Sequence, residues 1–164
     1  MAGKRSGRTR LLKASNALFA FALIFLCCSC DGVLMHKYEP VENGVWERGD
    51  TLLFTYINAG NNYPGDCSLL FEARIDASYR YRDLYVGVTA EGNDGFFASE
   101  TLHCAAYDSI GRHIEATAGI LYQLQSDTLD LGRVDCDTIV FRLSHAMLDC
   151  SLNGVYDIGV KLVH

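Results

Sequence analysis

The sequence predicts an all-β fold, an antiparallel β-sandwich of about seven to eight strands. Short segments in which apolar and polar residues alternate recur after residue 30, and no sustained apolar period of 3.6 residues occurs there. Turn-forming residues separate these segments. They stand at 43–44, 58–60, 63–65, 93–95 and 153–154. Frequent turns between short alternating segments are typical of two packed antiparallel sheets.

Four segments show the alternation clearly, and each predicts a strand with one buried face. They are residues 68–76, 84–89, 138–143 and 156–162. In the last of them the alternation places Tyr156 on the same, core-facing side as Ile158. Weaker strands are expected at 51–57, 101–107 and 120–125. The stretch 144–152 could hold a helical turn or a bulged loop.

The N-terminal segment differs from the rest of the 164-residue chain in charge. Residues 1–29 hold five basic residues and no acid, whereas residues 30–164 hold nine basic and 20 acidic residues, a net charge of -11. An apolar run at 17–28 follows the basic start. It is shorter than the ~20 residues that a spanning helix needs. We therefore expect a signal peptide at 1–29 and one β-sandwich domain at 30–164.

Cys30 follows the end of this apolar run by two residues, with Ser29 directly before it. This arrangement resembles the lipobox of bacterial lipoproteins, although Leu26 lies one residue further back than is usual. The resemblance implies cleavage before Cys30 and a lipid on its side chain, so that the membrane is a partner through the lipid. An ordinary cleaved signal with incidental cysteines is the alternative.

The sequence contains no motif that points to an enzyme. It lacks a Gly-x-Ser-x-Gly elbow, a Ser-x-x-Lys pair, a Walker loop and a His-Glu-x-x-His pair. We therefore expect no catalytic residues and no cofactor, with an exported hydrolase using Asp or Glu pairs kept as a rival because triads are spatial. The acidic balance also argues against nucleic acid, whose phosphates need a basic surface.

Four cysteines remain after the signal segment, at positions 67, 104, 136 and 150. An even number in an exported protein permits disulfides, with three pairings open for Cys67, Cys104, Cys136 and Cys150. A buried free thiol is the alternative for Cys104, which shares a predicted core face with Leu102.

No metal site is expected. The five histidines are well separated, and the acids between Asp127 and Asp137 lack the order of an EF-hand calcium loop. A solvated acidic loop fits residues 127–137 better.

Three tyrosines form the candidate ligand contact. Tyr79, Tyr81 and Tyr85 lie in a Tyr-Arg-Tyr-Arg-Asp-Leu-Tyr segment. On a strand, the three tyrosines would share one face, and Arg80 and Arg82 would lie on the other. An exposed aromatic strip of this kind can stack on sugar rings, and structural packing is the alternative.

Several segments together resemble the gliding motility lipoprotein H (GldH) family of Bacteroidetes. The segments are Trp46, 49–54, 79–85, 100–102, Asp108 with Gly111, and, as the closest match, 145–159. The resemblance implies a lipoprotein of the cell envelope, anchored to the inner or outer membrane, with its domain in the periplasm or at the cell surface. It further implies protein–protein contact with other envelope proteins in gliding or type 9 secretion machinery. A surface carbohydrate-binding lipoprotein is the alternative function.

Overall fold

The computed structural model describes residues 32–58, 65–112 and 119–164, and Gly32–His164 form one compact unit. The predicted cleavage and lipidation site at Cys30 lies outside the described residues. The all-β prediction is confirmed: the described residues form eleven strands, all paired antiparallel, and one short 3-10 turn, η1 (Glu42–Gly44).

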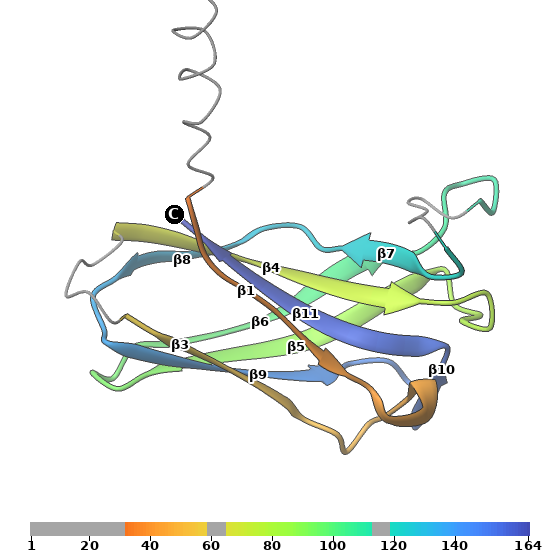
Figure 1. Ribbon diagram of the computed structural model, residues 1–164, viewed down its shortest axis with the longest axis horizontal. Helices are drawn as coiled ribbons and strands as arrows, with labels where there is room; N and C mark the ends of the chain where they lie inside the picture. The colour runs from red at the N-terminus through yellow and green to blue at the C-terminus, as the bar shows by residue number, and fades with distance from the viewer. Residues whose placement is uncertain (1–31, 59–64, 113–118) are drawn as a thin grey trace, which may run out of the picture. The chain divides into compact units, whose positions relative to one another are not determined.

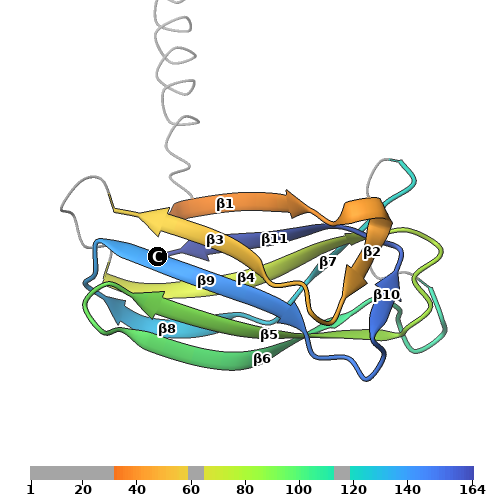
Figure 2. The same cartoon turned by 90° about the horizontal axis from the view of Figure 1, so that it is seen from below.

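Two sheets face each other across the core (Figures 1 and 2). Sheet I has the order β1-β11-β4-β7, and β8 also pairs with β4. Its strands are β1 (Val33–Pro40), β4 (Gly65–Ile75), β7 (Tyr122–Gln125), β8 (Leu129–Val134) and β11 (Val155–Val163). Sheet II has the order β3-β9-β5-β6. Its strands are β3 (Leu52–Ile57), β5 (Asp83–Gly92), β6 (Phe97–Ala105) and β9 (Thr138–His145).

The core consists of the residues that the alternation assigns to the inner faces of the sheets. The side chains of β4, β5 and β9 that were expected to be buried expose at most 1% of their surface. They are Leu69, Phe71, Ala73, Ile75, Leu84, Val86, Val88, Ile139, Phe141 and Leu143. Each large apolar side chain of this kind contributes about 1.5–3 kcal/mol by leaving water, and β11 adds Val155, Ile158, Val160 and Leu162 to the same core.

The expectation for Tyr156 is wrong, because β11 contains a bulge. Val155 pairs with Ile75 and Asp157 pairs with Arg74, which leaves Tyr156 as an extra residue on its strand. An extra residue reverses the side on which the preceding side chains point. Val155 is therefore buried, and Tyr156 is 41% exposed.

Two expected loops are partly strand. Residues 127–137, expected to be a solvated acidic loop, contain β8, on which Leu131 and Val134 are buried while Asp130 is exposed. The stretch 144–152 holds no helical turn: β9 continues to His145, and β10 (Ser151–Asn153) follows after a bend. β10 pairs with β2 (Val45–Glu47) to form a two-stranded sheet.

The sandwich has two distinct ends. Gly32 accepts a hydrogen bond from the backbone N–H of His164 at 2.9 Å, so the start and the end of the described chain meet at one end. β1 runs away from this end for eight residues, about 26 Å at ~3.3 Å per residue. β2, β10 and the loops at 76–82 and 146–150 lie at the opposite, distal end (Figure 2).

Candidate functional site

The predicted tyrosine strip does not form, because residues 79–82 precede β5 and are not part of a strand. Tyr79 has no exposed surface, and its hydroxyl donates to the backbone carbonyl of Asp83 at 3.0 Å. The Tyr107 hydroxyl in turn donates to the carbonyl of Tyr79 at 2.9 Å. Burial raises the pKa of Tyr79, which stays a neutral donor. Tyr79 therefore fixes the loop before β5 and cannot contact a surface ligand.

Tyr81 and Tyr85 do come together, in a pocket at the distal end. The pocket has a volume of about 370 Å³, and its lining is mostly apolar: Tyr81, Tyr85, Ala146, Met147, Leu148 and Asp149. Leu148 is 96% exposed, more than any other large apolar side chain of the described residues. We call the surface formed by Tyr81, Tyr85, Met147 and Leu148 the distal apolar surface.

Arg48 holds the loop that presents Leu148. Its Nη2 atom donates to the carbonyl of Met147 at 2.9 Å, to that of Asp149 at 3.2 Å and to that of Leu148. The Tyr81 hydroxyl donates to the Asp149 carboxylate from the other side. The backbone N–H of residue 146 donates to the carbonyl of Tyr85 at 2.8 Å. Because Arg48 and Tyr81 hold the loop from two sides, Leu148 is kept in its exposed position.

A buried histidine supports this loop from inside. His145 is 4% exposed, and its ring packs edge-to-face on Trp46 at 5.5 Å between centroids. Trp46 Nε1 donates to the carbonyl of Asp50 at 3.2 Å. Burial, and then the positive charge of Arg48, lower the pKa of His145. The imidazole is thus kept neutral beneath the distal apolar surface.

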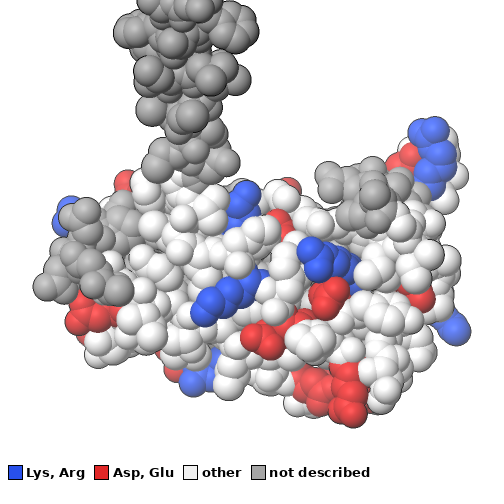
Figure 3. Space-filling model, in the orientation of Figure 1, with Lys and Arg blue, Asp and Glu red and all other residues white. Residues whose placement is uncertain are grey.

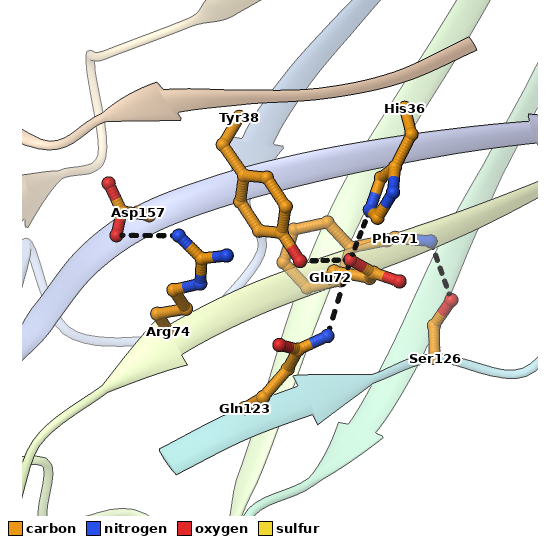
Figure 4. A network of polar contacts seen from close by, with 8 residues as sticks. All are labelled: His36, Tyr38, Phe71, Glu72, Arg74, Gln123, Ser126 and Asp157. Atoms are coloured by element: carbon orange, nitrogen blue, oxygen red, sulfur yellow. Dashed lines mark hydrogen bonds and ion pairs between the residues drawn. The ribbon is translucent and has the colours of Figure 1, made fainter. Parts of the chain in front are cut away.

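A second group of polar side chains covers the outer face of sheet I (Figure 4). Glu72 on β4 is only 3% exposed. His36 Nε2 lies 2.8 Å from its Oε2 atom, the Tyr38 hydroxyl donates to the same oxygen, and Gln123 Nε2 donates to it at 3.4 Å. The carboxylate therefore links β1, β4 and β7. We call His36, Tyr38, Glu72 and Gln123 the Glu72 cluster.

Tyr38 reaches Glu72 by lying across β11, over Gly159. A Cβ atom at Gly159 would stand 2.6 Å from the Tyr38 ring, so this crossing requires glycine. The Arg74 guanidinium lies 3.9 Å from the centre of the same ring and pairs with Asp157 at 3.6 Å. Burial and the Glu72 carboxylate raise the pKa of Tyr38. The cluster fastens the edge strand β1 to the sheet.

The charged side chains near this cluster alternate in sign. Figure 3 shows basic and acidic residues interspersed across the middle of the face that β1 and β11 form. Arg74 beside Asp157 is one such pair. This face therefore does not present charges of a single sign.

The cysteines and acids form no site in the described part of the chain. Cys67, Cys104, Cys136 and Cys150 are all free thiols, so the buried-thiol alternative describes Cys104, and its pKa rises to about 12 through burial. Among the described residues no three His, Cys, Asp or Glu side chains converge as metal ligands. The acids at 130 and 135 accept hydrogen bonds from the backbone of Gly132 and from Arg133.

The structure thus defines a small antiparallel β-sandwich domain with a fixed, apolar surface at one end. No helix among the described residues has the length and apolar character to cross a membrane. The chain belongs to the GldH lipoprotein family, whose family model matches residues 33–162. Membership associates the chain with the cell envelope and implies anchoring to a membrane. It is a family of lipoproteins and not a known enzyme family.

None of the curated proteins matches the chain significantly. Among solved structures, it is similar to the subviral particle of infectious bursal disease virus VP2, at 13% identity and a TM-score of 0.37. That match covers 82% of this chain and 34% of the viral chain, so the chain spans about a third of it. The baseplate tripod of bacteriophage Tuc2009 matches at 12% identity and a TM-score of 0.33, over 79% of this chain and 88% of the other. Eiger TNF from S. frugiperda matches at 8% identity and a TM-score of 0.31, over 79% and 92%.

Proposed function

We propose that this protein is a non-enzymatic, lipid-anchored component of gliding or type 9 secretion-related envelope machinery, and that it acts by protein–protein contact through the distal apolar surface. The observation that carries the proposal is Leu148, 96% exposed beside an apolar pocket. Rigidly held apolar groups rimmed by polar residues mark interaction sites, because covering them removes apolar area from water.

The position of this surface fits a partner that is a protein and not the membrane. A lipid on Cys30 would place the membrane two residues before Gly32. The distal apolar surface lies at the other end of β1, about 26 Å away at ~3.3 Å per residue. The lipid would confine the protein to the membrane surface and thereby raise its effective concentration near partners there.

The described polar side chains support a non-enzymatic role. His36 is paired with Glu72, and His103 Nε2 lies 2.8 Å from Asp83 Oδ1. His145 is buried in the core. A general base must reach a substrate in a cleft, and these histidines are engaged in packing or pairing instead.

A site-specific photo-crosslinking amino acid tests the contact. It is placed at position 148 in one strain and at the exposed Thr55 of sheet II in a matched control strain. We expect an adduct with an envelope protein from position 148 and none from position 55. No adduct at 148, or the same adducts at both positions, would overturn the proposed contact surface.

Fatty-acid labelling tests the anchor separately. Cells fed a labelled palmitate analogue should label the wild-type chain and leave the Cys30→Ala variant unlabelled. Label that persists in Cys30→Ala would refute the lipid assignment and leave the contact surface to its own test.

A further inference from the structure

The outer face of sheet II, which is turned toward the viewer in Figure 2, carries a trough that no part of the proposed function uses. Gly87 on β5 pairs with Thr101 on β6 and with Ser144 on β9, and Thr51 continues the row before β3. Val86 and Val88 point into the core, so Gly87 faces outward. The trough therefore runs across the strands, with a volume of about 470 Å³.

Large side chains stand on either side of Gly87 along this face of the sheet. The Gly87 position has no side chain, whereas the next outward residue of β5 toward the distal end is Tyr85, whose ring packs against His103 at 4.9 Å between centroids. The opposite side contains Arg142, which pairs with Glu91. The floor of hydroxyl groups and backbone thus has Arg142 and its ion pair on one side, and the Tyr85–His103 pair lies next to it on the distal side, outside the lining itself.

The chemistry of the lining excludes several ligand classes. Strand addition is blocked, because the backbone of β5 is already paired on both sides with β6 and β9. An anionic ligand would find Arg142 already paired with Glu91 and would meet the negative charge of Glu100. The lining is mostly polar, which disfavours a lipid or an apolar peptide.

The remaining chemistry matches a neutral, hydroxyl-rich molecule. Ser99, Thr101 and Ser144 each offer one donor and two acceptor positions. Arg142 and Glu91 add planar donors and acceptors at one wall. Tyr85, the next outward residue of β5 beside the trough, is 43% exposed and offers an apolar ring to a ligand that extends past Gly87. The volume lies within the ~300–1,000 Å³ range of small-ligand sites.

We infer that this trough binds an uncharged carbohydrate chain, with sugar hydroxyls on the Thr and Ser side chains and a sugar ring packed against Tyr85. The binding site goes beyond the proposed protein contact and uses a different face of the molecule. Tyr85 belongs to the distal apolar surface and also lies next to the trough along β5, so variants at other positions are needed to separate them.

The test is affinity electrophoresis of the full lipidated chain, kept in a detergent without a sugar headgroup. The gels contain xylan, mannan, a β-1,3-glucan or dextran, and alginate serves as the anionic comparison. Gly87→Gln fills the trough without backbone strain, since a Cβ at Gly87 meets Ser144 only at 3.7 Å. Thr101→Val removes a hydroxyl at nearly constant shape, and Thr55→Gln is the control on the same face.

We expect at least one neutral polysaccharide to retard the wild type, with about tenfold or greater weakening in Gly87→Gln and Thr101→Val, the effect of ~1.4 kcal/mol. Thr55→Gln and Leu148→Asp should bind as the wild type does, which separates this site from the protein contact. Absence of retardation by all four neutral polysaccharides overturns the inference. So does unchanged binding in folded Gly87→Gln and Thr101→Val, or preference for alginate.

Discussion

Replacing Tyr38 by Phe removes one hydroxyl from the Glu72 cluster and leaves the ring in place over Gly159. Glu72 is 3% exposed, and the lost donor is one of three groups at the same carboxylate oxygen. A hydrogen bond to a charged group contributes about 1.5–3 kcal/mol, and leaving a buried acceptor short of a donor adds its desolvation cost. Because Tyr38 itself is partly exposed, we expect a loss near the lower end, ~2 kcal/mol of unfolding free energy.

The assay is urea unfolding followed by the fluorescence of Trp46, the only tryptophan of the chain and fully buried. With a slope of ~2 kcal/mol/M, the expected loss lowers the midpoint by about 1 M. Tyr85→Phe, at a tyrosine that is 43% exposed on the outer face of sheet II, is the matched control and should leave the midpoint unchanged. An unchanged midpoint in Tyr38→Phe would refute the view that the Glu72 cluster fastens β1.

A double-mutant cycle locates the effect. Gly159→Ala places a methyl group 2.6 Å from the Tyr38 ring, which has to move away and lose Glu72. In the Gly159→Ala background, Tyr38→Phe should therefore cost much less than it does alone. Full additivity of the two changes would mean that Tyr38 and Gly159 act independently.

Three further predictions concern the interior. Because the folded state lowers the pKa of His145, the unfolded chain takes up this proton at a higher pH than the folded chain does, and stability should be full above about pH 6.5 and fall as the pH drops below it. The difference between the urea midpoints at pH 5 and pH 8 should therefore be smaller in His145→Leu than in the wild type. An equal difference would contradict the assignment. Phe71→Ala should lower the unfolding free energy by ~3–5 kcal/mol in the same assay, because Phe71 has no exposed surface, and a small loss would mean that the core repacks. Cys150 should react rapidly with a thiol reagent in the native protein, whereas Cys104, whose burial raises its pKa to about 12, should react only after unfolding. Cys150→Ser should remove one rapidly reacting thiol. An unchanged number of rapidly reacting thiols would refute the exposure of Cys150.

The sequence predicts the fold correctly in those strands whose alternation of apolar and polar residues matches the burial of their side chains. β4, β5 and β9 bury the residues that a period of two predicts, because their inner faces line the core of the sandwich. β1 carries no such signal: its burial does not alternate, and it is held by Tyr38 and His36 reaching a residue on another strand. The bulge that turns Tyr156 outward depends on pairing with β4, which a single strand pattern does not contain.

The candidate surfaces were harder to predict, since each is assembled from distant segments. The Tyr-Arg-Tyr-Arg-Asp-Leu-Tyr segment pointed to Tyr81, but its partner Asp149 lies 68 residues further along the chain. Leu148 carries no motif, and its exposure depends on the contacts of Arg48 with the 146–150 loop. The trough over Gly87 requires the register of β5 with β6 and β9. The strip of tyrosines failed because buried Tyr79 closes a loop instead of extending a strand.

Crosslinking from position 148 in living cells tests the central claim most directly. A partner that contacts the distal apolar surface should be captured from position 148, and Leu148→Asp should abolish that partner's co-purification without changing the unfolding midpoint. Thr55, on the outer face of sheet II, should give no adduct. If the same partner still co-purifies with Leu148→Asp, or is captured equally from position 55, the distal apolar surface is not the contact.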